Sequence, residues 1–134
     1  MRLGGPIPLD RDNPDPERWT QEARARGYTA VTWPIGFDAP TPLVEGFVAA
    51  AGSADLTIAE VGAWSNPLSP DEHTRRDARA RCVAALETAE RVGARCCVNI
   101  APSLGEKPDG PAPRDLTEEA VDRIIETRRG RTDE

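Results

Sequence analysis

The sequence has few of the residues that build metal centres, disulfide frameworks and membrane spans. It holds one histidine, His73, and three cysteines among 134 residues. Three cysteines cannot complete a disulfide framework, and Cys96 and Cys97 are adjacent in a predicted strand, so we expect buried free thiols. No cluster of His, Asp and Glu has the spacing of a metal site. No apolar run approaches the ~20 residues of a membrane span.

Several catalytic and targeting motifs are missing as well. The sequence has no Gly-x-Ser-x-Gly elbow, no P-loop, and no Gly-x-Gly-x-x-Gly turn after a strand. The N-terminus lacks the apolar stretch of a signal peptide, which predicts a cytoplasmic protein. The net charge of -6 argues against binding to a phosphate backbone, so we expect no nucleic-acid partner. The lack of a long apolar run predicts that there is no membrane partner either. The catalytic residues therefore stay unknown at this point.

What the sequence does contain is a strand–helix unit, repeated four times. Predicted strands cover residues 2–5, 30–33, 56–61 and 96–100, and predicted helices cover residues 16–26, 42–51, 70–92 and 118–129. This alternation predicts an α/β fold with a parallel sheet and right-handed crossovers. Periodicity does not separate a barrel from an open doubly wound sheet, although the missing phosphate turn disfavours the open sheet.

We expect residues 1–134 to form a single domain, with a long Pro/Gly-rich loop at 101–117 and a polar tail at 130–134. All 13 prolines follow a predicted strand or lie in the first turn of the next helix. The loops at the carboxyl ends of the strands are therefore the long ones, and in parallel β/α folds those loops build the active site.

The helix ends carry local signals. Four residues with side-chain oxygens stand where an N-cap is expected, namely Asp15, Thr41, Ser69 and Thr117. Ser69 and Glu72 have the spacing of a capping box. Four glycines stand where a left-handed residue can stop a helix, namely Gly27, Gly52, Gly93 and Gly130. A stripe at helical spacing predicts the buried face of the third helix, formed by Ala78, Cys82, Ala85, Leu86, Ala89 and Val92.

Five residues at the carboxyl ends of the predicted strands are candidates for substrate binding, namely Trp33, Glu60, Trp64, Asn66 and Asn99. Period-two alternation places Glu60 and Trp64 on one face. A carboxylate inside a strand is costly unless it is paired or used. Glu60 is therefore either a structural acid, bonded to neighbouring strands or to Arg2, or an acceptor for substrate hydroxyls.

The other candidates also have two readings. Trp33 either stacks on the apolar face of a sugar or plugs the end of the barrel. Asn99 shares a face with Cys97, which makes an inward-pointing ligand group one of its options. His73, between Glu72 and Thr74, is interpreted as a solvated helix residue.

The run from Ala59 to Ser69, AEVGAWSNPLS, followed by the run from Val92 to Ile100, VGARCCVNI, resembles the sugar phosphate isomerase/epimerase family. That family belongs to the xylose isomerase-like TIM-barrel superfamily, which also holds endonuclease IV. The resemblance implies a (β/α)8 barrel of which this chain has only the first four βα units, a half-barrel. It also implies metal-assisted proton transfer, an isomerisation or epimerisation, on a sugar or polyol, with Mn, Mg, Co or Zn in a complete barrel.

In barrels of that kind the metal ligands come mainly from strands five to eight, so no metal ligand is assigned in this chain. Four readings stay open. The chain is a truncated isomerase that is inactive alone, a half-barrel that pairs with itself or with a complementary half-barrel, a non-catalytic sugar- or polyol-binding module, or an endonuclease IV-like repair barrel. Acidic charge and the lack of histidines at strand ends count against the last reading.

Overall fold

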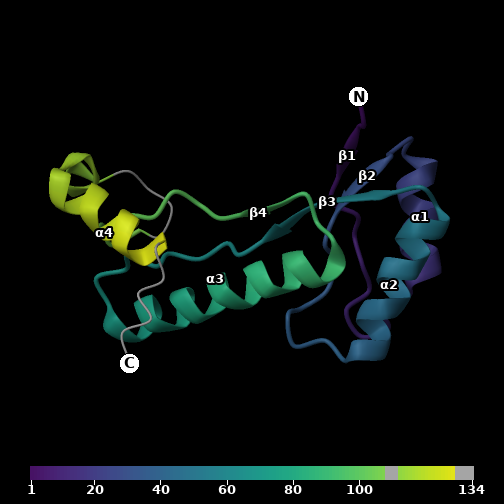
Figure 1. The fold of residues 1–134 in the computed structure, drawn as a ribbon, viewed down its shortest axis with the longest axis horizontal. Helices are drawn as coiled ribbons and strands as arrows, with labels where there is room; N and C mark the ends of the chain where they lie inside the picture. Colours follow the sequence, from purple (N-terminus) through teal and green to yellow (C-terminus); the bar gives the residue numbers. More distant parts are fainter. Residues whose placement is uncertain (108–111, 129–134) are drawn as a thin grey trace. The chain divides into compact units, whose positions relative to one another are not determined.

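The computed structural model describes residues 1–107 and 112–128. Within them, strands and helices alternate along the chain (Figure 1). The strands are β1 (Gly4–Gly5), β2 (Ala30–Thr32), β3 (Thr57–Gly62) and β4 (Cys96–Val98). The helices are α1 (Pro16–Ala25), α2 (Thr41–Ser53), α3 (Glu72–Val92) and α4 (Glu118–Arg128), with a 3-10 helix, η1 (Pro113–Leu116), before α4. In the described part of the chain, no helix is both long and apolar enough to cross a membrane.

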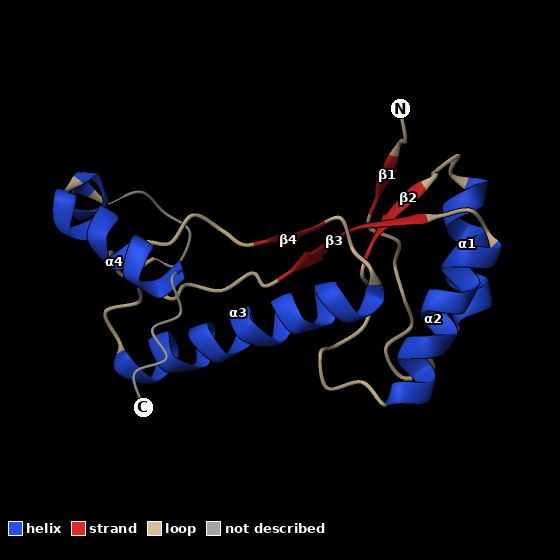
Figure 2. Ribbon diagram, viewed as in Figure 1, coloured by secondary structure: helices blue, strands red, loops and turns tan. Residues whose placement is uncertain are grey.

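The strands form one parallel sheet in the order β1-β2-β3-β4 (Figure 2), which confirms the predicted α/β fold. β1 approaches β2 so closely that only glycine fits at position 4. A Cβ on Gly4 would lie 2.2 Å from the carbonyl oxygen of Ala30. Because each strand is followed by a helix, every connection within the sheet is a β/α crossover.

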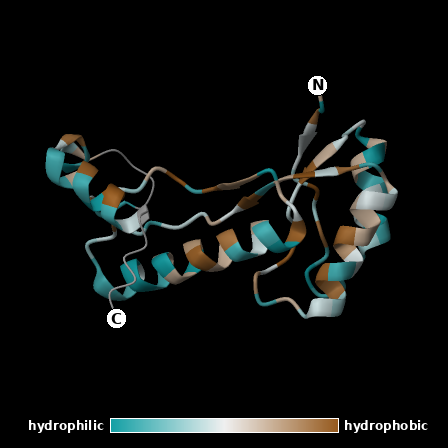
Figure 3. Ribbon diagram, in the orientation of Figure 1, coloured by the Kyte–Doolittle hydropathy of each residue, from teal (hydrophilic) through white to brown (hydrophobic). Residues whose placement is uncertain are grey.

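The chain forms two compact units. Unit 1 comprises residues 1–62 and 85–98, and unit 2 comprises residues 63–84 and the described residues after 98. The sheet lies in unit 1, where Trp19, Phe47, Val31 and Val61 are almost completely buried. Trp19 and Trp33 both meet the Phe47 ring edge-on, with centroids 5.3 and 6.2 Å away. Figure 3 shows apolar residues gathered along β3 and β4.

Unit 2 has a smaller core. Leu68, Leu104 and Ala120 are buried together, and Ile124 packs against them. This cluster brings α4 against the loop that follows β3 and the loop that follows β4. The packing of α4 therefore depends on loop residues.

Several helix ends follow the sequence signals. The Asp15 carboxylate accepts from the backbone N–H groups of Glu17 and Arg18, at 2.9 and 3.1 Å, and caps α1. The Thr117 hydroxyl accepts from the Ala120 N–H at 3.3 Å, at the start of α4. After α1 and α3, the chain turns through Gly27 (φ +73°) and a second left-handed glycine at position 93 (φ +67°).

Both expected ends of α2 are wrong. The helix begins at Thr41 with Pro40 at the N-cap, and the Thr41 hydroxyl instead accepts from Arg91 at 2.9 Å. Gly52 lies inside α2, and the left-handed residue is Asp55, with φ +50°. The Arg2 guanidinium holds Asp55 by its carbonyl oxygen at 2.8 Å and its carboxylate at 3.0 Å. That contact joins residues 53 positions apart, so no local pattern reveals it.

The predicted capping box of α3 is wrong as well. The helix begins at Glu72, and the Asp71 carboxylate accepts from the Thr74 N–H at 2.7 Å. Ser69 is buried before the helix, and its carbonyl oxygen accepts from Arg75 at 2.8 Å. Asp71 takes the cap because it directly precedes the helix, where its carboxylate reaches the Thr74 N–H.

Two further expectations meet different outcomes. The apolar stripe of α3 is confirmed at its alanines and at Val92, whereas Leu86 is exposed. The thiols are not buried as expected: Cys96 is exposed, and Cys82 and Cys97 are half-buried. The expected stop at Gly130 and the tail at 130–134 lie outside the described residues.

Candidate functional site

A shift in strand register decides where Glu60 points. Val31 of β2 pairs with Ile58, but the next residue, Thr32, pairs with Glu60, so β3 carries one extra residue at this point. A β-bulge of this kind turns the bulged strand so that alternation restarts beyond it. Ile58 and Val61 are buried, whereas Ala59 and Glu60 between them are half-buried.

The bulge places Glu60 on the face of the sheet away from its buried residues. Glu60 pairs with Thr32 on one side and with Cys96 on the other. We call the surface formed by Thr32, Glu60 and Cys96 the open face. Within the described residues, the Glu60 carboxylate makes no hydrogen bond and no ion pair, and Arg2, its expected structural partner, binds Asp55 instead. Glu60 is therefore a half-buried acceptor without a partner in the part of the chain described.

Thr32 and Cys96 lie beside Glu60 on the open face, and neither is among the candidates for binding predicted from the sequence. Cys96 is exposed, and its thiol lies 3.4 Å from the Ala59 carbonyl oxygen. Both residues reach the open face through pairing with Glu60 across neighbouring strands. The bulge that sets this pairing has no local sequence signature, and Cys96 is expected from the sequence to be a buried thiol.

Trp33 is buried against helix α2. It is 9% exposed and meets Phe47 of α2 at an interplanar angle of 69°. Its indole N–H, like that of Trp19, has no hydrogen-bond partner among the described residues. Trp33 therefore fills the space beside α2, and a role in substrate binding stays a prediction.

Trp64, in unit 2, stands out by its exposure and its backbone. Its side chain is 58% exposed, and its φ of +45° is in the left-handed region that bulky residues avoid. Both neighbours are fixed: the Ala63 carbonyl oxygen accepts from Arg81 at 2.6 Å, and the Ser65 N–H donates to Asn99 at 2.9 Å. These bonds hold the backbone in place and leave the indole ring exposed.

Asn66 joins two loops of unit 2. It is 4% exposed; its amide donates to the Ser103 carbonyl oxygen at 2.8 Å and accepts from the backbone N–H groups of Ser103 and Leu68, each at 3.1 Å. Ser103 in turn donates to Asp115 at 2.8 Å. The Asn66 amide is thus engaged within the fold.

Asp115 completes this network. It accepts from the Leu104 N–H at 2.7 Å, from the Ser103 hydroxyl, and from the Ala112 N–H at 2.8 Å. These bonds, the one from Leu104 foremost, hold the pKa of the Asp115 carboxyl below its usual value, because they favour the charged form. The loop between β4 and α4 is therefore tied to one carboxylate.

Asn99 points toward a helix. Its amide N–H lies 3.4 Å from the Cys82 sulfur on α3, and its carbonyl oxygen accepts from the Ser65 N–H. The side chain therefore positions the loop around Trp64. A substrate contact by Asn99 stays a prediction.

The described residues do not form a metal centre. No group of three or more His, Cys, Asp and Glu side chains among them is placed to hold an ion. His73 is exposed on α3 and pairs with Asp77 at 3.0 Å, which fits its interpretation as a solvated helix residue. On the open face, Glu60 and Cys96 offer one carboxylate and one thiol.

Comparison with known proteins supports the fold. No family model and no curated protein matches the sequence. Among solved structures, the chain is similar to endonuclease IV from Thermus thermophilus, with a TM-score of 0.59 and 19% sequence identity. The match covers 95% of this chain and 47% of that one, so this chain spans about half the length of its structural relative. The architecture is thus an α/β fold with four parallel strands, matching part of a TIM barrel.

Proposed function

We propose that this chain forms part of a TIM-type barrel that binds a sugar or polyol, and that the open face contacts the substrate hydroxyls. The observation that supports the proposal is the unpartnered carboxylate of Glu60, aimed at that face by the bulge in β3. Removing a carboxylate from water is costly unless a donor replaces the lost water. Vicinal hydroxyls of a polyol are donors of that kind.

The chemistry open to these side chains is limited. Ionised Glu60 accepts hydrogen bonds, and Thr32 both donates and accepts, so together they can orient a hydroxylated carbon chain. In a complete barrel of the isomerase or epimerase kind, a divalent metal would polarise a carbonyl. The described residues do not fit such a metal, and we assign no step to it. The role proposed here for the chain is substrate binding, with proton transfer as the reaction of the complete barrel.

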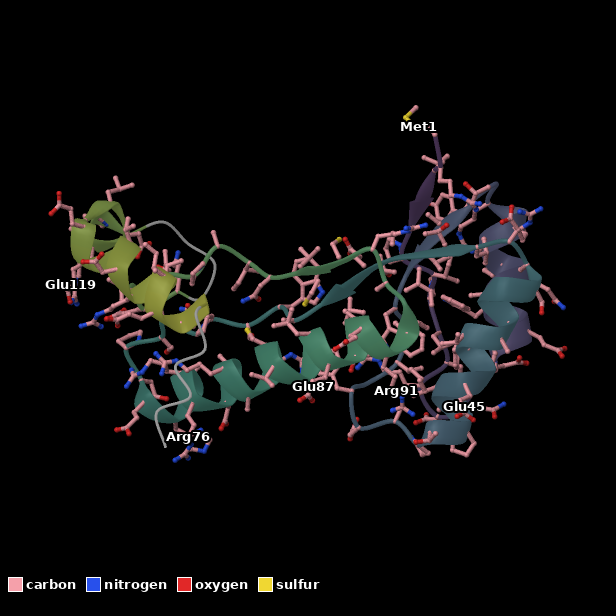
Figure 4. The ribbon with its side chains drawn as sticks, viewed as in Figure 1. Met1, Glu45, Arg76, Glu87, Arg91 and Glu119 are labelled. Atoms are coloured by element: carbon pink, nitrogen blue, oxygen red, sulfur yellow. The ribbon has the colours of Figure 1, made fainter. Side chains whose placement is uncertain are left out.

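The test is a titration of the purified chain with D-fructose, D-xylulose and myo-inositol, followed by backbone amide shifts in NMR spectra. Binding should shift the amides of residues on the open face. Glu60→Gln should weaken binding by about tenfold or more, because a hydrogen bond to a charged acceptor is lost. Glu45→Gln is the matched control, because Glu45 is an exposed carboxylate on α2 (Figure 4).

The three possible results of the titration lead to different conclusions. Binding that is weakened by Glu60→Gln and unchanged by Glu45→Gln supports the proposal. Equal affinity of both variants and the wild type would remove Glu60 from the site. No binding of any of the three compounds would overturn the proposed function.

A second candidate function is action on nucleic acid, favoured by the structural similarity to an endonuclease. The net charge of -6 weighs against it, because backbone binding needs positive charge. Incubation with supercoiled plasmid DNA, with and without added Mg²⁺, Mn²⁺ or Zn²⁺, tests it directly. Conversion to nicked circles that follows the chain through purification would support this candidate over sugar binding.

A further inference from the structure

We propose that two copies of this chain close one eight-stranded barrel, and that Glu60 of each copy lines its single interior. The role of Glu60 in this inference rests on the proposed function. The pairing of the two copies rests on the sheet alone. The sheet of unit 1 has two edges, β1 and β4. An edge strand carries unpaired N–H and C=O groups, which are a template for another strand.

The hydrogen bonds show which backbone groups are free at the β4 edge. The Arg95 N–H donates to the Ile58 carbonyl oxygen at 3.1 Å, toward β3. Because successive residues of a strand point to opposite sides, the N–H groups of Cys96 and Val98 point to the free edge. At the other edge, the Leu3 carbonyl oxygen accepts from Thr29 and Ala30, so the peptide groups of Gly4 point outward.

The order and direction of the strands identify a second copy as the occupant. All four strands are parallel and follow the chain order, so β1 of another copy placed beside β4 continues both the direction and the order. A two-fold axis along the strands makes the two junctions identical, as in the closed dimers common among proteins. Two sheets of four strands give the eight that a barrel of this kind needs.

The structural comparison agrees with this count of strands. The chain matches 47% of its structural relative, so that relative has about as much chain again beyond the matched part. A second copy supplies the same number of strands as the first. It also covers surface that a single sheet leaves open, where Leu3 is 65% exposed beside β1 and Cys96 is exposed on β4.

The strands at the edges limit the strength of the dimer. β1 has two residues and β4 has three, so each junction adds few hydrogen bonds. Association then depends mainly on burial of apolar side chains at the edges, such as Leu3. We therefore expect a dimer that dissociates on dilution.

Two-fold symmetry places the two Glu60 side chains at the same level on opposite walls of one interior. A sugar bound there meets both carboxylates, and the site is incomplete in one copy. The consequence is a stoichiometry of one sugar for two chains. One wild-type subunit paired with one Glu60→Gln subunit should bind with intermediate affinity.

The experiment is light scattering after size exclusion over a hundredfold range of concentration. The chain has a mass of 14.5 kDa, and the proposal expects twice that mass at the highest concentration and a decline toward a single copy on dilution. Leu3→Lys, at the β1 edge, should shift the equilibrium to the monomer by at least tenfold. Leu86→Lys is the matched control, because Leu86 is 59% exposed and lies on helix α3, not on a strand of the sheet.

Each result decides between the proposals. A chain that stays monomeric at every concentration overturns the dimer, and if that monomer binds sugar through Glu60, the proposed function survives. A dimer weakened by Leu86→Lys but not by Leu3→Lys places the interface elsewhere and also overturns the inference. A dimer weakened only by Leu3→Lys supports the barrel, and if it binds no sugar, only the proposed function fails.

Discussion

Trp64 combines an exposed ring with a backbone conformation that costs free energy. A left-handed φ is disfavoured for a bulky residue by about 1 kcal/mol or more. The ring is 58% exposed and so recovers little of that cost through burial. An arrangement of this kind persists only where the surrounding bonds impose it, and here Arg81 and Asn99 hold both flanking peptides.

We therefore predict that Trp64→Asn increases the free energy of unfolding by about 0.5–1 kcal/mol, because Asn tolerates the left-handed region. Urea denaturation followed by circular dichroism measures the change. Trp19→Asn is the contrasting variant and should destabilise the chain by about 3–5 kcal/mol, because Trp19 is 1% exposed. A large loss of stability in Trp64→Asn would show that the ring packs against the fold in solution.

The five candidate residues show how much of the site the sequence alone predicts. Glu60 is recognisable as a candidate because a carboxylate inside a strand is costly unless it is paired or used. Asn66 and Asn99 are candidates for substrate binding in the sequence, and in the structure their amides bind loop and helix atoms. An asparagine in a loop gives no sign of whether its partner is substrate or backbone, because both offer the same donors and acceptors.

Helix α3 offers a direct contrast between two N-cap residues. The Asp71 carboxylate caps the helix, and hydrogen bonds from the Thr74 side chain and then its backbone N–H lower the pKa of Asp71. Asp71→Ala should lower the melting temperature of α3, because the Thr74 N–H loses its acceptor. Ser69→Ala should have a smaller effect, since Ser69 binds Arg75 through its backbone carbonyl. Circular dichroism at 222 nm during heating compares the two variants. A larger effect of Ser69→Ala would show that Ser69 caps the helix, as the predicted capping box requires.

Asp115 makes the loop before α4 sensitive to acid. Its pKa is below the usual 3.8 in the folded chain, so its ionisation stabilises the fold above pH 3.8. That contribution decreases as the pH falls from 3.8 through the folded pKa, because protonation removes the acceptor. Hydrogen exchange at the Leu104 amide should accelerate in this window relative to the Val61 amide, after correction for intrinsic rates. Unchanged relative protection between about pH 5 and about pH 2.5 would contradict the role of Asp115.

Local patterns predicted the elements better than their boundaries. Caps such as Asp15 and Thr117, and the glycine turns, depend on a few neighbouring residues, so the sequence reveals them. The end of α2 depends on Arg2, and the direction of Glu60 depends on pairing between β2 and β3. Such features arise from contacts between distant segments, which periodicity does not encode.

Two compact units within one chain predict that unfolding is not a single step. Unit 1 buries Trp19, Phe47, Val31 and Val61 around its sheet, whereas the apolar cluster of unit 2 consists of Leu68, Leu104 and Ala120 with a partly buried Ile124. Because hydrophobic stabilisation scales with the apolar area buried, unit 2 should unfold at the lower urea concentration.

Helix α3 allows this prediction to be tested within a single helix, because residues 72–84 belong to unit 2 and residues 85–92 belong to unit 1. Amide exchange in increasing urea should release Ala78 and Leu104 before Ala89 and Val61. Fluorescence reports mainly on unit 1, where Trp19 and Trp33 are buried, so its midpoint should follow the later transition. Coincident transitions at all four amides would mean that the chain unfolds as one cooperative body, and the small core of unit 2 would then owe its stability to unit 1.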